Sequence, residues 1–112
     1  MWQKSIVRSC CEIRGRSYPE DCTRIYNPVI EWIKAYSQNS SPRGIDFNFH
    51  FQYISSSSTL SIIKIIQELK TCGEKGFDVK LIWNYDKDDE DIKELGSKFE
   101  DSLGISLTYN AI

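Results

Sequence analysis

Residues 45–53, IDFNFHFQY, alternate strictly between apolar and polar side chains, and they constrain the fold more than any other segment. A period of two is typical of a β-strand, because successive side chains point to opposite faces of a sheet. One predicted face carries Phe47, Phe49, Phe51 and Tyr53; the other carries Asp46, Asn48, His50 and Gln52. A strand with one aromatic and one polar face belongs to a sheet that is covered on one side only.

Three other segments show the same alternation. Residues 79–85, VKLIWNY, place Val79, Leu81, Trp83 and Tyr85 inward and Lys80, Ile82 and Asn84 outward. Residues 105–109 alternate near the C-terminus, with Ile105, Leu107 and Tyr109 on one face, and residues 10–16 alternate weakly, with Cys11 and Ile13 sharing a face. Four strands are therefore predicted, with a helix-free face that carries Asn48, His50, Gln52, Lys80 and Asn84.

Apolar residues at helical spacing lie between the predicted strands. In the first such segment they are Ile25, Tyr26, Val29, Ile30, Trp32, Ile33 and Tyr36. Pro28 interrupts this stripe. Either Asn27 caps a helix that has Pro28 at its first position, or one longer helix is kinked at Pro28.

Two more helices are predicted over residues 58–72 and 91–103. The apolar stripe of the first consists of Leu60, Ile62, Ile63, Ile65, Ile66 and Leu69, and that of the second of Ile92, Leu95, Phe99 and Leu103. Gly73 and Gly76 are typical signals for the end of the first of these helices. The broken patterns SYPED, around Pro19, and NSSPRG, residues 39–44, predict a turn and a loop.

The order of strand, helix, strand, helix, strand, helix, strand predicts an α/β fold. Strands joined through helices are parallel with right-handed crossovers, so we expect a mixed, mostly parallel sheet of four to five strands. All helices pack on its single apolar face. At 112 residues the chain is long enough for one domain spanning residues 1–112.

Composition argues against several classes of function. A formal net charge of −2 without a Lys/Arg cluster argues against nucleic acid and anionic membranes as partners. The first eight residues, MWQKSIVR, are too short for the apolar region of a signal peptide, and no apolar run approaches the ~20 residues of a membrane span. Cytoplasmic localisation is therefore expected.

The four cysteines do not have the spacing of a metal site. Cys10, Cys11, Cys22 and Cys72 form no C-x-x-C pair, and His50, the single histidine, lies far from them along the chain. We interpret them as free thiols in a reducing cytosol and expect neither a metal nor a cofactor.

Five hydroxyl residues in a row, SSSST at residues 55–59, stand between the aromatic strand and the helix that follows. One hydroxyl suffices to cap a helix, so the run is explained either by capping with low-complexity drift or by a regulatory phosphosite. A phosphate at a helix start meets free N–H groups and the positive end of the helix dipole. It also adds roughly −1.5 to −2 of charge to the surface that a partner contacts.

The acidic stretch DKDDED, residues 86–91, precedes the last helix. Acids stabilise a helix N-terminus, and parallel strands would also bring this stretch to the end of the sheet where the serines lie. A docking surface there would include Ser55, Ser57, Ser58, Asp86, Asp88 and Asp89.

A third class of function is an enzyme or small-molecule binder, which would use the acidic stretch to bind a metal or a ligand. No nucleophile–histidine set or glycine-rich phosphate loop supports catalysis.

With these segments in place, the chain resembles the SiaC family of bacterial regulatory phosphoproteins, whose fold is like that of the anti-sigma-factor antagonists (STAS-like). The residues that carry the resemblance are GRSYPE (15–20), YNPVIEW (26–32), FHFQYISSSS (49–58), VKLIWNYDKDDED (79–91) and KELG (93–96).

The resemblance implies a non-catalytic, phosphorylation-controlled switch. The phosphoacceptor would be the hydroxyl residue three positions after the strand tyrosine, which is Ser56, with Ser55 and Ser57 as alternates. A Ser/Thr protein kinase and a PP2C-type phosphatase would act on it. The unmodified form would bind and activate a diguanylate cyclase, raising cyclic di-GMP and favouring biofilm. An adaptor of the anti-sigma-factor-antagonist type in another partner-switching pathway is the alternative. Ser56 stands where the family usually has threonine, and Leu60 where lysine is common.

Overall fold

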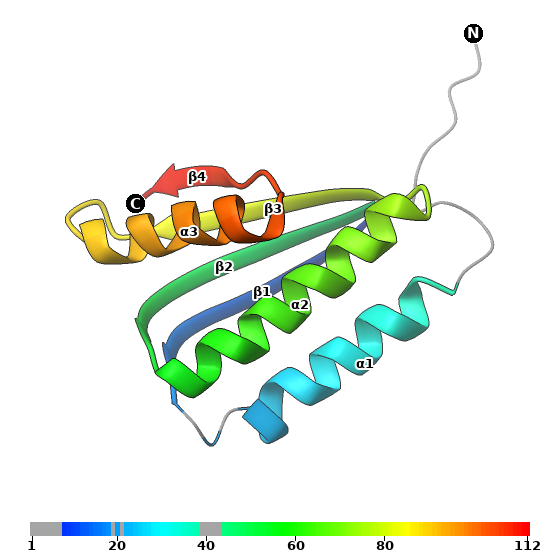
Figure 1. Ribbon diagram of the computed structural model, residues 1–112, viewed down its shortest axis with the longest axis horizontal. Coiled ribbons are helices and arrows are strands. Elements are labelled where there is room, and N and C mark those ends of the chain that lie inside the picture. Colours follow the sequence, from blue (N-terminus) through cyan, green and yellow to red (C-terminus); the bar gives the residue numbers. More distant parts are fainter. Residues whose placement is uncertain (1–7, 19, 21, 39–43) are drawn as a thin grey trace, which may run out of the picture.

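A computed structural model describes residues 8–18, 20, 22–38 and 44–112. Its elements are β1 (Arg8–Ser17), a π-helical turn η1 (Cys22–Tyr26), α1 (Asn27–Tyr36), β2 (Gly44–Ile54), α2 (Ser56–Glu74), β3 (Asp78–Tyr85), α3 (Glu90–Leu103) and β4 (Thr108–Ala111). The predicted order of four strands and three helices is confirmed (Figure 1).

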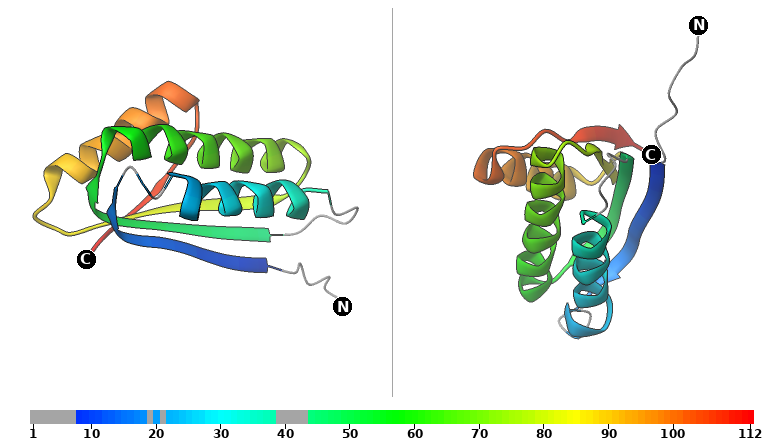
Figure 2. Two further views of the ribbon diagram at one scale, coloured as in Figure 1. Left: turned by 90° about the horizontal axis from the view of Figure 1, so that it is seen from below. Right: turned by 90° about the vertical axis from the view of Figure 1, so that its right-hand side faces the viewer.

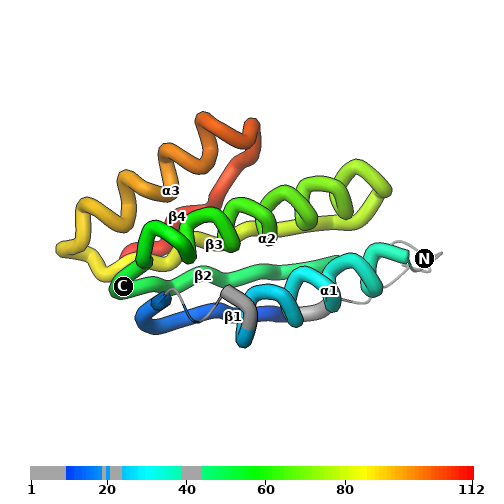
Figure 3. Tube along the Cα trace, turned by 60° about the horizontal axis from the view of Figure 1, so that its bottom comes forward, coloured from blue at the N-terminus to red at the C-terminus, as the bar shows by residue number. Residues whose placement is uncertain are grey.

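The four strands form one sheet in the order β1-β2-β3-β4, and every neighbouring pair is parallel. All three helices lie on one face of this sheet, as the edge-on view shows (right panel of Figure 2). The tube trace shows α1 and α2 running along the sheet, with α3 beyond them over β3 and β4 (Figure 3). The predicted α/β class and the single covered face are therefore confirmed, and the sheet is wholly parallel among the described strands.

The core lies between the sheet and the helices. Phe47, Phe49 and Phe51 of β2 are buried, and the indole of Trp83 on β3 packs against the last two with ring centroids 5.6 and 6.1 Å apart. On the other side the core is completed by Ile62, Ile65, Ile66, Leu69 and Cys72 of α2. The alternation thus predicted the buried face correctly as far as Phe51.

The predicted inward position of Tyr53 is wrong. Its side chain is 44% exposed, while Ile54 packs against the core. The pairing of β1 with β2 shifts at this point: Gly15 pairs with Phe51, and Arg16 pairs with Tyr53. One extra residue in β2 interrupts the period of two, and the face of the next side chains changes.

Three apolar residues assigned to helix stripes are also exposed. Ile25 is 44%, Trp32 39% and Leu60 65% exposed. Leu60 is two residues from the buried Ile62, which places the two side chains about 200° apart around a helix of 3.6 residues per turn. Assigning every apolar residue of these helices to the buried stripe therefore predicted stripes that were too wide.

The interruption at Pro28 takes the form of a π-helical turn. η1 ends at Tyr26 and runs directly into α1, with Pro28 near the start of α1 and no side-chain cap. Proline has no N–H to donate to a carbonyl one turn earlier, and a wider turn accommodates the missing bond. Asn27 is the first helical residue and not the cap.

The last strand begins later than predicted, at Thr108. Ile105 and Leu107 lie in the connection from α3, where the carboxylate of Glu100 accepts the backbone N–H of Leu107 at 2.8 Å and the hydroxyl of Tyr109 at 2.6 Å. These bonds hold residue 107 to α3, so pairing with β3 starts only afterwards.

Several predicted segments lie outside the described residues. They are the first seven residues of MWQKSIVR, Pro19 and Asp21 of the predicted turn, and residues 39–43 of the predicted loop. The side chain of Cys22, predicted as a free thiol, also lies outside the described part of the chain. Within the part of the chain that the structure describes, no helix has the length and apolar character needed to cross a membrane.

Candidate functional site

The serine run and the acidic stretch meet at the carboxyl end of the parallel sheet. β2 leads into the serines and β3 into the acids, and the two strands are neighbours running in the same direction. Figure 1 shows the starts of α2 and α3 at this same end of the molecule. The predicted proximity of these two segments follows from the parallel pairing.

Ser55 and Ser58 are built into the fold. The backbone N–H of Ser55 donates to the carbonyl of Ser17 at 2.9 Å, and its side chain caps α2 by accepting the N–H of Ser58 at 3.1 Å. The hydroxyl of Ser58 donates to the carbonyl of Tyr18 at 3.1 Å and lies 2.8 Å from the hydroxyl of Ser55. Both side chains are buried, so these two serines join β1, β2 and α2.

Ser56 and Ser57 are the exposed members of the run. They occupy the first two positions of α2, immediately after the Ser55 cap. Thr59, the fifth hydroxyl residue, returns its side chain to the carbonyl of Ser55 at 3.2 Å. Of the five hydroxyls, only those of Ser56 and Ser57 are both solvent-exposed and at the start of the helix.

Exposed apolar side chains surround this helix start. Tyr18 and Tyr53 are 42% and 44% exposed, and their ring centroids lie 5.6 Å apart. Leu60 is one helical turn after Ser56, a spacing that places the two residues side by side on the surface of α2. We call Tyr18, Tyr53 and Leu60 the aromatic–leucine patch. Tyrosines are enriched in protein interfaces, and such a patch is suited to a partner.

Sequence reasoning missed this patch because it assigned Tyr53 and Leu60 to the core. Two signals pointed to it. Tyr18 stands in a predicted turn, where a large aromatic side chain has no strand or helix to bury it. Leu60 falls opposite Ile62 on a helical projection.

An open groove of about 490 Å³ borders the patch. The end of β2 forms one wall and the first half of α3 the other, through Gln52, Tyr53, Ile54, Asp89, Asp91, Ile92, Glu94, Leu95 and Lys98. Its lining combines apolar side chains with three carboxylates and one lysine. The groove therefore combines apolar surface with a local excess of negative charge next to the serines.

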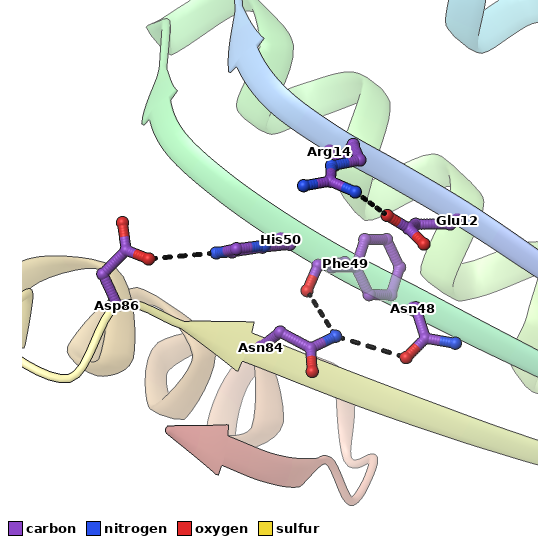
Figure 4. Close-up of polar contacts among 7 residues, drawn as sticks. All are labelled: Glu12, Arg14, Asn48, Phe49, His50, Asn84 and Asp86. Carbon is purple, nitrogen blue, oxygen red and sulfur yellow. Dashed lines mark hydrogen bonds and ion pairs between the residues drawn. The ribbon is translucent and has the colours of Figure 1, made fainter. Parts of the chain in front are cut away.

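The acids of the stretch differ in their surroundings. Asp86 pairs with the ring of His50 at 3.1 Å, which ties the stretch to the centre of the sheet (Figure 4). Asp89 caps α3 by accepting the N–H of Ile92 at 3.1 Å. Asp88 is exposed. Glu90, Asp91 and Glu94, which follow on α3, are exposed as well, so these carboxylates remain accessible at this end of the sheet.

The uncovered face of the sheet carries a chain of polar contacts (Figure 4). The side-chain amide of Asn84 donates to the side chain of Asn48 and to the carbonyl of Phe49, both at 3.2 Å. Asn110 donates to Asn84 at 2.8 Å. His50 lies on this uncovered face, yet its side chain is only 14% exposed. Neighbouring strands on both sides shield a residue of a central strand even where no helix covers it.

Among the described cysteines, Cys10, Cys11 and Cys72 are free thiols. Burial raises the pKa of the Cys72 thiol, and burial together with the neighbouring Cys10 raises the pKa of Cys11. Raised pKa values keep thiols protonated and unreactive. Within the described ranges no three His, Cys, Asp or Glu side chains converge as metal ligands.

Comparison with known proteins shows what this chain is related to. The family model for "SiaC family regulatory phosphoprotein" matches residues 5–111. A curated protein of Pseudomonas aeruginosa strain UCBPP-PA14, which is uncharacterised, is 25% identical over 99 residues, covering 88% of this chain and 78% of its own length.

Solved structures agree with this match. One of them is the SiaC of Pseudomonas aeruginosa in complex with diguanylate cyclase SiaD, of which it is the activator. That SiaC is similar to this chain with a TM-score of 0.80 and 25% identity, over 90% of this chain and 82% of that chain. Another SiaC structure from that organism has a TM-score of 0.72 and 26% identity over 90% and 78% of the two chains. Its apo form shares the fold, with a TM-score of 0.76 at 24% identity over 89% and 80%. The chain belongs to the SiaC family of regulatory phosphoproteins.

Proposed function

We propose that this protein is a cytoplasmic, non-catalytic switch whose unphosphorylated form binds and activates a diguanylate cyclase. Its switch residue is Ser56, which a Ser/Thr protein kinase modifies and a PP2C-type phosphatase restores. The observation that carries the proposal is the exposure of Ser56 in the first turn of α2, beside Leu60 and two exposed tyrosines. Likeness to a SiaC seen with its cyclase supports the class of partner.

Ser56 has the position that such a switch requires. Ser55 and Ser58 are engaged in the hydrogen bonds that join β1, β2 and α2, so modification of either would disrupt them. Ser56 and Ser57 take part in none of these three hydrogen bonds, and both residues are exposed to solvent. A phosphate at the start of a helix is compatible with the dipole and with the free N–H groups there. Modification of Ser56 therefore changes the surface and leaves the core intact, with Ser57 as the alternate acceptor.

Phosphorylation prevents binding through charge and desolvation. A partner that covers the aromatic–leucine patch brings the hydroxyl of Ser56 into a contact largely free of water. A phosphate at this place carries roughly −1.5 to −2 of charge and has to be desolvated without a matching cation. The carboxylates of Asp91 and Glu94 in the neighbouring groove add to the field against anionic groups of the partner.

The experiment is a comparison of wild type, Ser56→Ala, Ser56→Asp and the phosphorylated protein. Phosphopeptide mapping after treatment with the kinase should place the phosphate on Ser56. Calorimetry against the cyclase should give wild-type affinity for Ser56→Ala, weaker binding for Ser56→Asp and the weakest for the phosphoprotein, with melting temperatures unchanged. Cyclic di-GMP synthesis should follow binding.

Leu60 offers a second test of the surface. We expect Leu60→Ala to weaken cyclase binding by about 1–2 kcal/mol, or roughly 5–30-fold, as for an interface anchor. Because Leu60 is exposed, its removal should leave the melting temperature unchanged. Ile25→Ala is the matched control, since Ile25 is an exposed apolar residue on η1 outside the patch. Equal effects of the two substitutions, or tighter binding by the phosphoprotein, would contradict the proposed surface.

A further inference from the structure

β1 (Arg8–Ser17) is a long strand at the edge of the sheet. It pairs with β2 on one side, and no described residue pairs with its other side. Unpaired N–H and C=O groups along such an edge are a template for another strand. Proteins often block such edges with proline or with charged side chains. β1 contains no proline, and its charges have both signs: Glu12 stands among three arginines.

The sequence of β1 is complementary to itself about Ile13. Glu12 precedes Ile13 and Arg14 follows it, and both project on the uncovered face of the sheet, where they form an exposed ion pair at 3.3 Å (Figure 4). In an antiparallel pair of identical strands with its two-fold axis at Ile13, Glu12 of each copy lies opposite Arg14 of the other. Opposite charges directly across such a pair are stabilising.

We propose that β1 pairs antiparallel with β1 of a second copy of this chain around Ile13, which joins two four-stranded sheets into one. Neighbouring registers are disfavoured by charge: an axis at Glu12 sets Glu12 against itself, and an axis at Arg14 sets Arg14 against itself. Like charges directly opposite each other on paired strands are destabilising. The positions of Glu12 and Arg14 therefore favour a second copy of this chain, paired in the register with its axis at Ile13.

The covered face of the sheet adds apolar contact to this pairing. Between β1 and α1 lies an apolar groove of about 230 Å³, lined by Cys11, Glu12, Ile13, Pro28, Val29, Trp32 and Phe47. Trp32 is 39% exposed beside it. A stable interface buries at least about 1,200 Å² in total, more than a short strand pairing alone supplies. The two-fold axis brings the groove and Trp32 of one copy next to those of the other, and their burial adds apolar area to that of the strand pairing.

Charge reversal tests the pairing on the intact protein. Light scattering and sedimentation over a concentration series should give wild type a mass of twice the 13.0 kDa chain. Arg14→Glu should raise the dimer dissociation constant at least tenfold, with an unchanged circular dichroism spectrum. The double reversal Glu12→Arg/Arg14→Glu should restore the dimer dissociation constant to within threefold of the wild-type value. A monomeric wild type at high concentration, or a dimer indifferent to Arg14→Glu, overturns the proposal.

Cysteine crosslinking tests the register. In a Cys10→Ser/Cys11→Ser background, Ile13→Cys places two thiols at the axis and should give a disulfide-linked dimer on mild oxidation. Glu12→Cys in the same background is the control, since the two residues at this position face Arg14 of the other copy and should not crosslink. Efficient crosslinking of the Glu12 variant, or none of the Ile13 variant, overturns this register. Ser56 plays no part in either assay, so failure of the dimer is distinguishable from failure of the switch.

Discussion

Gly96 on α3 is the residue whose substitution gives the sharpest test of the packing. A Cβ added at Gly96 would lie 2.9 Å from two atoms of the Trp83 indole, Cδ1 and Nε1, and 3.1 Å from a third. The indole cannot easily withdraw. Its Nε1 donates to the carbonyl of Ile92 at 2.9 Å, and its ring packs edge-on against Phe99 with centroids 5.7 Å apart.

Two opposite effects set the magnitude for Gly96→Ala. Replacing a helical glycine by alanine ordinarily stabilises a protein by about 0.4–1 kcal/mol, because the unfolded chain loses freedom. Overpacking a rigid core costs about 1–3 kcal/mol. The clash should prevail, with a net loss of about 0.5–2 kcal/mol in the free energy of unfolding. At about 4 °C per kcal/mol for a domain of this size, the melting temperature should fall by about 2–8 °C.

Gly73 is the matched control. It also lies in a helix, α2, and a Cβ there would meet nothing within 4 Å. Gly73→Ala should therefore raise the free energy of unfolding by about 0.4–1 kcal/mol. Urea titrations of the two single variants and wild type measure both effects. If Gly96→Ala stabilises the protein as Gly73→Ala does, the close approach of α3 to Trp83 is wrong.

A double-mutant cycle separates the clash from other effects on the helix. Trp83→Phe opens space beside Gly96, so the alanine should cost less in that background than in wild type. The coupling free energy between the two positions should then be favourable and of order 1 kcal/mol. Simple additivity would mean that the alanine does not meet the indole.

Three further changes have outcomes fixed by the contacts. Ser55→Ala removes the α2 cap and should lower the free energy of unfolding, measured by urea titration, by about 0.5–2 kcal/mol. Ser57→Ala, at an exposed position, should change it by less than about 0.5 kcal/mol. Equal effects would contradict the assignment of Ser55 as the cap and Ser57 as a surface residue. Phe49→Ala should cost about 3–5 kcal/mol, and a melting temperature within a degree or two of wild type would place that ring on the surface. Burial and the bond to the Glu100 carboxylate raise the pKa of Tyr109, so its stabilisation is present below about pH 10 and is lost as pH rises through the higher folded pKa. Tyr109→Phe should therefore lose less stability than wild type over that alkaline range, and parallel losses would refute this.

The alternation of residues 45–53 predicted β2 and its buried face because burial on one side of a sheet imposes a period of two. It failed at Tyr53, where the extra residue of β2 relative to β1 resets the period. This register shift arises from the pairing of β1 with β2, so the alternation within β2 alone could not predict it. The same applies to His50, which is shielded by the neighbouring strands and paired with Asp86, a residue 36 positions away in the sequence.

Glycine in KELG illustrates a motif whose reason is visible only in three dimensions. In the sequence Gly96 weakens an otherwise regular helix. In the fold it allows the backbone of α3 to approach the indole of Trp83, which itself belongs to another segment of the family resemblance. The two segments are therefore coupled through one contact. Such coupling explains why their joint presence in one chain is more specific than either segment alone.

The serine run shows how the structure assigns roles that composition leaves open. Five hydroxyls exceed what one cap requires, and the sequence could not distinguish an excess due to drift from one with a purpose. The fold uses three of them: Ser55 caps the helix, Ser58 links α2 to the carbonyl of Tyr18, and Thr59 returns to Ser55.

The remaining pair, Ser56 and Ser57, follows the cap directly and is exposed. A buried serine can be modified only when the helix start opens, because its hydroxyl and its bonding partners must first be separated. An exposed serine in the same turn reaches a kinase from the folded state, and the capping bonds next to it hold the backbone in place while its charge changes. The buried serines are therefore what makes the exposed ones suitable as a switch. Substitution of Ser58 by alanine should accordingly increase the mobility of the α2 start, measured as faster amide exchange at residues 56–59, while Ser57→Ala leaves it unchanged. Protection that is equal in the two variants would show that the bond between Ser58 and Tyr18 does not hold this turn.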